Sequence, residues 1–254
     1  MKILYLLQVI LLASCQSVSK NAEKPQESST FNQTVLLFPE KGAESQKLTI
    51  SMSFPSIPGG RTIEDSVNAV LYEGDAPQAY ADKIYSSYKE LYESIKAIAE
   101  NSETANWYYT EEIRVLTGQD AETPVGTVKT PLLQIKRTIE EYTGGAHPIH
   151  NTQFYVFDAQ SGRRLSIEDF VQDAEALIQT VEASLCRDKG VAPGTPLDEA
   201  EITFLGKEHL DSLPDNFFLT DQGVGFYWNE YEIAPYSTGG IKTVVLYDDI
   251  HLSN

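Results

Sequence analysis

Cysteine is scarce in this chain of 254 residues, which contains only Cys15 and Cys186. Cys15 is expected to carry a lipid, for the reason given below, so Cys186 has no partner and an intrachain disulfide is excluded. A nucleophilic thiol needs an activating base, and the sequence around Cys186 offers none. We therefore interpret Cys186 as a small apolar residue at the edge of a helix.

Positive charge is also scarce, since 19 lysines and arginines stand against 37 aspartates and glutamates and the formal net charge is −18. No cluster of basic residues with interleaved aromatics occurs, so the sequence predicts no nucleic-acid partner. A surface this acidic repels nucleic acid and anionic lipid and attracts a cationic partner. The alternative is that the acidic side chains only keep a secreted protein in solution.

The apolar segment near the N-terminus, residues 3–12, is too short to span a bilayer. It follows Lys2 and runs into Leu12-Ala13-Ser14-Cys15, the pattern of a bacterial lipobox, in which cleavage exposes an acylated cysteine. Residues 1–14 are therefore predicted to be a lipoprotein signal peptide, with Cys15 as the lipidated residue. The alternative is an uncleaved anchor or an ordinary signal peptide.

The residue after the predicted lipidation site is Gln16 and not Asp, which by the usual sorting rule favours the outer membrane. We therefore expect a lipid-anchored protein of the cell envelope. The following residues are rich in Ser, Asn, Glu and Gln and bury too little apolar surface to fold. Residues 15–33 are predicted to be a flexible tether.

Apolar periodicity in the rest of the chain predicts an α+β fold, with antiparallel strands throughout and packed helices. A polar segment at residues 118–130 is expected to separate two closely associated α+β subdomains, residues 34–130 and 131–254. One antiparallel sheet is expected from the strands 107–116, 132–142, 149–157, 224–228 and 241–247, with helices at 81–98 and 174–186 packed on it. A hairpin of strands 35–38 and 48–54 and a short helix capped by Thr62 precede them.

The centre of this organisation is a long hairpin, in which apolar Leu133, Ile135 and Ile139 alternate with polar residues such as Gln134. This alternation predicts one buried face and one polar face for the first strand. The loop that closes the hairpin contains Gly144-Gly145-Ala146-His147-Pro148.

Gly144 and Gly145 permit positive φ angles, and Pro148 keeps the chain extended as it leaves the turn. We interpret Gly144, Gly145, His147 and Pro148 as a structural loop, in which the imidazole of His147 hydrogen-bonds the turn that holds it.

Four short motifs occur in the order found in one known family. They are Gly144-Gly145-Ala146-His147-Pro148, Leu165-Ser166-Ile167-Glu168-Asp169-Phe170, Phe218-Leu219-Thr220-Asp221-Gln222-Gly223 and Tyr231-Glu232-Ile233-Ala234-Pro235-Tyr236. With these motifs, residues 132–252 resemble the extracellular domain of the lysozyme-sensing anti-sigma factor RsiV. The same domain precedes the catalytic domain of peptidoglycan N-acetyl deacetylases of the PdaC type. Residues 35–130 resemble the accompanying N-terminal domain through a strand–Pro–helix pattern at residues 54–70.

This resemblance implies an α+β envelope domain that is not itself a known catalyst. In RsiV-like members the domain binds lysozyme, and beside deacetylases it is expected to help hold cell-wall substrate. The chain differs from RsiV-like members in having no anti-sigma segment and no membrane-spanning helix. Signalling by cleavage of a transmembrane anchor is therefore not expected.

Sequence patterns of the common enzyme classes are missing: there is no Gly-x-Ser-x-Gly elbow, phosphate loop or dinucleotide fingerprint. His147 and His150 lack the third ligand of a zinc site, and Asp248-Asp249 lacks the further histidines of a polysaccharide deacetylase. We expect no catalytic residue, no metal and no cofactor. The alternative is a metal-assisted hydrolase or deacetylase of cell-wall material, with a site built from His147 and acidic side chains.

The segment at residues 229–240 fits a ligand-binding loop, because rigid aromatic side chains on loops carry much of the energy of recognition. Tyr231 and Tyr236 are the predicted anchors, Pro235 stiffens the backbone, and Glu230 and Glu232 suit a basic partner. The alternative, that the tyrosines close the end of the core, has equal weight. The predicted function is a lipid-anchored envelope protein that binds a cationic protein such as lysozyme, or cell-wall glycan (peptidoglycan).

Overall fold

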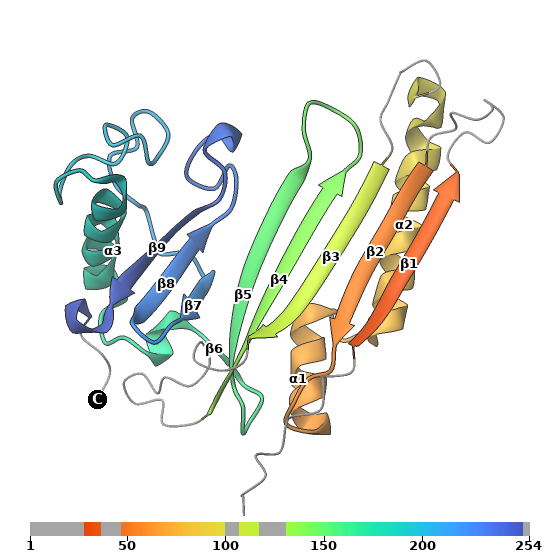
Figure 1. Ribbon diagram of the computed structural model, residues 1–254, viewed down its shortest axis with the longest axis horizontal. Coiled ribbons are helices and arrows are strands. Elements are labelled where there is room, and N and C mark those ends of the chain that lie inside the picture. Colours follow the sequence, from red (N-terminus) through yellow and green to blue (C-terminus); the bar gives the residue numbers. More distant parts are fainter. Residues whose placement is uncertain (1–27, 37–46, 100–106, 117–130, 251–254) are drawn as a thin grey trace, which may run out of the picture.

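In the computed structural model of the protein, residues 28–36, 47–99, 107–116 and 131–250 are described. They form a larger sheet in the order β1-β2-β3-β4-β5-β6 and a smaller one in the order β7-β8-β9 (Figure 1). The elements are β1 (Ser28–Leu36), β2 (Lys47–Pro55), α1 (Arg61–Leu71), α2 (Pro77–Ala99), β3 (Trp107–Leu116), β4 (Leu132–Tyr142), β5 (Ile149–Asp158), β6 (Arg164–Leu165), η3 (Ile167–Asp169), α3 (Ala174–Lys189), β7 (Phe217–Leu219), β8 (Gly223–Trp228), η4 (Tyr236–Thr238), β9 (Ile241–Leu246) and η5 (Tyr247–Asp249). The predicted α+β class is confirmed.

The larger sheet is mixed, because β2 and β3 run parallel, with Leu48 opposite Trp107. Its other strand pairs are antiparallel, including the two strands that flank the glycine loop. The prediction of antiparallel strands throughout is therefore wrong at one pair. α1 and α2 lie in the connection between β2 and β3, and a helical crossover returns the chain in the same direction.

The second correction concerns β8 and β9, which were predicted to join the same sheet as β3, β4 and β5. They pair with each other and with β7 in a separate antiparallel sheet, and α3 packs against β9 (Figure 1). β6 pairs with this edge of β5 only at Val156 and Phe157, and side chains of the segment 216–230 occupy the rest of it. Among the described helices, none is both long and apolar enough to cross a membrane.

The outer edge of β5 is closed by side chains from the segment 216–230. The backbone N–H groups of alternate residues donate to them: His150 to Glu230 (3.3 Å), Thr152 to Asn229 (2.6 Å) and Phe154 to Asn216 (2.8 Å). An open strand edge offers unpaired backbone groups, and here carboxylate and amide side chains satisfy them in place of a neighbouring strand. These bonds hold the smaller sheet and the loop after it against the hairpin.

The β4–β5 hairpin contributes to two hydrophobic cores. The core beneath α1 and α2 contains Leu133, Ile135 and Phe157 of the hairpin, whereas the core around α3 and the smaller sheet contains Leu132 and Val156. The predicted subdomain boundary at residue 130 falls between β3 and β4, which pair in one sheet. The first core therefore draws residues from both sides of that boundary.

Gln134 was predicted on the polar face of the hairpin, yet only 1% of its surface is exposed. Its amide Nε2 donates to the carbonyl of Leu219 at 3.1 Å, and its Oε1 accepts from the N–H of Leu219 at 2.8 Å. The side chain thus pairs with a backbone peptide as a neighbouring strand would. Packing of β7 over this face explains why alternation alone misplaced Gln134.

Three predicted element ends are also corrected. β1 begins at Ser28, inside the predicted tether, because pairing with β2 stabilises a polar segment that composition alone classes as unfolded. α1 begins at Arg61 with Gly60 as its N-cap and no side-chain cap, so Thr62 is not the cap. α2 begins at Pro77, four residues before the predicted start, where proline suits the first helical turn.

The predicted cap of α3 is confirmed, because the side chain of Asp173 accepts the N–H of Ala176 at 2.9 Å.

Candidate functional site

The predicted ligand-binding loop and the glycine loop of the hairpin meet at one end of the molecule. The rings of His147 and Tyr236 are stacked, with 3.5 Å between centroids and an interplanar angle of 15°. The ring of Tyr231 lies 5.8 Å from that of Tyr236, and its hydroxyl is 3.2 Å from His147 Nε2. The structure therefore joins two groups of residues that the sequence had left separate.

His150 extends this cluster toward two carboxylates. Its Nδ1 is 2.9 Å from Glu230 Oε1, and its Nε2 is 3.8 Å from Glu140 Oε1. The ring of Tyr236 also lies near His150, with 6.5 Å between centroids. We call these six residues (Tyr231, Tyr236, His147, His150, Glu140 and Glu230) the tyrosine–histidine patch.

A rigid backbone presents the tyrosines of the patch. Tyr231 has a positive φ of 68° and is 55% exposed, a strained conformation that the surrounding loop must hold in place. Pro235 precedes η4, and its carbonyl accepts the N–H of Thr238 at 2.9 Å. This short turn carries Tyr236 onto the imidazole of His147. Side chains that are already ordered lose less entropy on binding a partner.

Glu232, a predicted ligand-binding residue, has a different role. Its carboxylate accepts the backbone N–H of Asn229 at 2.8 Å and the Asn229 side-chain amide at 3.2 Å. Asn229 is 8% exposed and in turn accepts the N–H of Thr152. Glu232 therefore orients the residue that joins the loop to β5, and it contributes to the patch indirectly.

The glycine loop has the geometry that its sequence predicts. Gly144 and Gly145 have φ angles of 97° and 106°, and the hydroxyl of Tyr142 donates to the carbonyl of Gly145 at 2.9 Å. The Nδ1 of His147 lies 2.9 Å from the carbonyl oxygen of Pro148. His147 thus contacts its own turn with one nitrogen and Tyr231 with the other.

The patch is negatively polarised. The two segments that build it, residues 138–162 and 208–241, contain no lysine or arginine. The hydroxyl of Tyr108 donates to Glu140 at 2.7 Å, and this bond raises the pKa of Tyr108 to about 12. Partial burial, followed by the charge of Glu230, raises the pKa of Tyr236, so both phenols stay neutral at ordinary pH.

Three residues at this site were not identified as binding residues from the sequence: Tyr108, Glu140 and His150. The register of the hairpin places Glu140 directly opposite His150, and Tyr108 opposite Tyr142 on the adjacent strand. The short glycine loop fixes the first of these pairs, so a register argument would have found it. The second pair, Tyr108 with Tyr142, could be found only by predicting that β3 pairs with β4, and residues 117–130 separate these two strands in the sequence.

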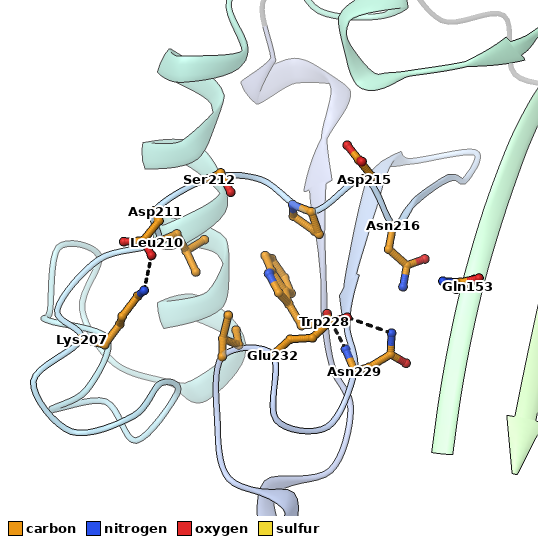
Figure 2. Close-up of a pocket in the computed structure, with 12 residues that line it drawn as sticks. Gln153, Lys207, Leu210, Asp211, Ser212, Asp215, Asn216, Trp228, Asn229 and Glu232 are labelled. Carbon is orange, nitrogen blue, oxygen red and sulfur yellow. Dashed lines mark hydrogen bonds and ion pairs between the residues drawn. The ribbon is translucent and has the colours of Figure 1, made fainter. Parts of the chain in front are cut away.

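A cavity of about 370 Å³ lies on the other side of Asn229, between β5, the end of β8 and the segment that precedes β7 (Figure 2). Its lining includes Trp228, Glu232, Asp215 and Gln153. Elsewhere, the thiol of Cys186 is buried in the second core and lies 3.5 Å from the carbonyl of Thr195. Within the described residues, no three His, Cys, Asp or Glu side chains are grouped to hold a metal ion.

Comparison with known proteins relates the chain to proteins of unknown function. No curated protein matches it. A DUF3298 family member from Bacteroides fragilis NCTC 9343 has a similar structure, with a TM-score of 0.67 and 24% identity over 91% of this chain and 94% of that chain. A DUF3298 family protein from Pseudomonas aeruginosa PAO1 has a TM-score of 0.55 and 17% identity over 91% and 95% of the two chains.

A family model described as "Protein of unknown function (DUF3298)" matches residues 168–248. This family is found in the C-terminal regions of RsiV and PdaC, the proteins that the sequence motifs resemble. The chain shares its fold with solved DUF3298 proteins, and its C-terminal part, residues 168–248, matches the DUF3298 family model.

Proposed function

We propose that the chain is a cell-envelope binding protein that recognises a cationic protein, such as lysozyme, through the tyrosine–histidine patch. The observation that carries this proposal is the preordered stack of Tyr236 on His147 beside the half-exposed Tyr231. Tyrosine and arginine are enriched among the residues that dominate binding energy, and tyrosine rings attract Lys and Arg side chains.

Electrostatics favour a cationic partner over a neutral one. Glu140 and Glu230 flank the aromatic rings, and the segments around them supply no positive side chain. The whole chain adds a net charge of −18, which steers a basic protein toward it over a distance of about a Debye length. The metal-assisted hydrolase alternative has no specific observation in its favour.

The lipid anchor on Cys15 and the location at the outer membrane belong to the same proposal. Their support is the lipobox and Gln16, in residues that lie outside the described structure. A Cys15→Ala variant is expected to lose incorporation of labelled palmitate in a bacterial host and to leave the membrane fraction. Acylation that persists in this variant would contradict the anchor and leave the binding site unaffected.

Binding is tested by biosensor measurements with the full chain, solubilised in detergent, against native lysozyme and against lysozyme with acetylated lysines. Acetylation removes the charge of lysine, so the acetylated form should bind much more weakly. Tyr236→Ala should weaken binding of native lysozyme by about 2 kcal/mol. Tyr85→Ala, at a partly exposed tyrosine of α2, is the matched control and should bind as the parent does. No binding of native lysozyme would contradict the named partner.

A further inference from the structure

The tyrosine–histidine patch contains two imidazoles whose protonation decides its charge. Glutamate side chains are ordinarily ionised at neutral pH, so Glu140 and Glu230 give the patch its negative charge there. Histidine is the side chain that ordinarily gains a proton as the pH falls from about 8 to about 5. Each protonated imidazole therefore cancels one of the two charges that attract a cationic partner.

The neighbours of His150 determine which of its ring nitrogens carries hydrogen. Its Nδ1 lies 2.9 Å from Glu230 Oε1, and an ionised carboxylate only accepts, so Nδ1 carries the hydrogen of the neutral ring. Nε2 then presents a lone pair toward Glu140 Oε1, which is 3.8 Å away and too far for a hydrogen bond. A proton added at Nε2 points toward Glu140, so the imidazolium lies between two carboxylates and interacts with both.

His147 is held in the same tautomer. Its Nδ1 lies 2.9 Å from the carbonyl oxygen of Pro148, which only accepts, so the neutral ring accepts from the Tyr231 hydroxyl at Nε2, over 3.2 Å. Protonation places an N–H at Nε2, and the Tyr231 hydroxyl must turn to accept it. The positive charge then lies against the stacked ring of Tyr236, at the centre of the predicted anchors.

The other titratable groups that face the two imidazoles come from four elements. They are Glu140 on β4, Glu230 and Tyr231 on the loop after β8, Tyr236 on η4 and, through Glu140, Tyr108 on β3. Glutamates ordinarily titrate at about pH 4.3 and tyrosines at about pH 10. Between about pH 7.5 and about pH 5.5, the histidines are therefore the groups of the patch that change charge.

We propose that the patch is a pH-dependent switch, which holds a cationic partner near neutral pH and releases it on acidification through protonation of His150 and His147. This inference rests on the proposed function, because it concerns the regulation of the same surface. Only 11% of the Glu230 side chain is exposed, against 45% for Glu140, so solvent screens the charge of Glu230 less. His150, which contacts Glu230 directly, therefore has the larger share of the effect.

The pH dependence of lysozyme binding is the first test. The full chain should bind lysozyme about tenfold more tightly at about pH 7.5 than at about pH 5.5, because two charges that face a cationic group are cancelled. In a His147→Gln, His150→Gln double variant the two affinities should be nearly equal. His209→Gln is the matched control, since this exposed histidine faces Glu182 outside the patch, and it should keep the parent's ratio. Equal affinities of the parent at the two pH values, or a ratio that persists in the double variant, would overturn the proposal.

NMR of the histidine rings in the unmodified full chain gives a second test, which needs neither lysozyme nor a folded variant. In their neutral forms His147 and His150 should both carry hydrogen on Nδ1. Decalysine, whose lysines stay charged throughout, should shift their protonation to lower pH more than that of His209, because binding and protonation are reciprocal.

The outcomes for the switch and for the proposed partner are distinguishable. A chain that binds no lysozyme at about pH 7.5 contradicts the named partner, and the NMR titration then decides on the switch. The proposal is overturned if both imidazoles stay neutral down to about pH 5.5, or if decalysine leaves their titration unchanged.

Discussion

At the scale of single residues, Tyr231 combines strain with exposure. Its φ of 68° lies in the left-handed region, which glycine adopts freely and other residues rarely adopt. The exposed residues Glu73 and Glu201 also have positive φ angles, but Tyr231 differs from them in placing an aromatic ring beside His147 and Tyr236. This agrees with its place in the patch.

Two substitutions at Tyr231 separate its effect on stability, through backbone strain, from its effect on binding. Tyr231→Gly should be more stable than Tyr231→Ala by about 1 kcal/mol, because glycine relieves the left-handed strain. Both variants should lose the aromatic anchor to the same extent and bind lysozyme equally weakly. Urea denaturation measures the stability of the two variants, and biosensor measurements give their affinity for lysozyme. Equal stability of the two variants would contradict the claim that the backbone of Tyr231 is strained.

The ion pair between Asp169 and Arg163 makes the free energy of unfolding depend on pH. Arg163 donates to both of its carboxylate oxygens, at 2.8 and 3.1 Å, and this hydrogen bonding lowers the pKa of Asp169 below its ordinary value of 3.8. Because the folded-state pKa is depressed, the contribution is present above the ordinary pKa and is lost as pH falls through the folded value. Exposure of Arg163 and solvent screening keep the contribution small.

The corresponding variant is Asp169→Asn, which keeps an acceptor for the N–H of Ser166 and removes the charge. The parent should be the more stable protein near neutral pH, and the difference should shrink as pH is lowered from about 6 to about 3. Urea denaturation at each pH measures it. A difference that stays constant over this range would exclude the ion pair as its source.

For strands and helices, sequence patterns predicted the features that depend on interactions between residues close in the sequence. The hairpin of β4 and β5 and the cap at Asp173 follow from alternation, loop glycines and capping chemistry within a few residues of each other. The parallel pair of β2 and β3 could not be predicted in this way, because a distant connection decides it. Gln134 was misplaced for the same reason, since its partner Leu219 is 85 residues away.

The hydrogen bonds that close the edge of β5 can be tested by mutation. Asn216→Ala removes the acceptor for Phe154 N–H and the donor to Thr152 O, which lie at 2.8 and 2.7 Å, and should lower the free energy of unfolding by about 1–3 kcal/mol. Hydrogen exchange at the Phe154 amide should accelerate. The amide of Gln153, which is in register with Arg137 of β4, should change less.

Asn216→Asp is the matched control for this experiment. The carboxylate can still accept from Phe154, but it has no donor for the carbonyl of Thr152. Exchange at Phe154 should therefore stay slow in this variant. Equal acceleration in both variants would show that the amide oxygen does not protect the edge of β5.

At the scale of the whole molecule, the two cores meet on one hairpin, and the same hairpin carries half of the patch. The sequence predicted both loops of the site, Tyr231 and Tyr236 on one and His147 on the other, but not their contact. That contact depends on how the smaller sheet packs against β5 through Asn216, Asn229 and Glu230. Interactions so distant in sequence leave no local pattern.

The net charge of the whole molecule is expected to affect the rate at which lysozyme associates with it. Raising the salt concentration from about 50 to about 300 mM should slow the association of lysozyme more than it speeds dissociation, because screening acts on steering. The aromatic contacts, in contrast, should set the rate of dissociation. Association and dissociation rates from one biosensor series separate the two effects.

The most direct test of lysozyme binding at the tyrosine–histidine patch is the affinity of lysozyme for the Tyr231→Ala, Tyr236→Ala double variant of the full chain. Circular dichroism first establishes that the variant is folded. We predict a loss of at least about 2 kcal/mol, roughly 30-fold in the dissociation constant, relative to a parent that binds. A folded double variant that binds lysozyme as tightly as the parent would contradict the assignment of this patch as the binding surface.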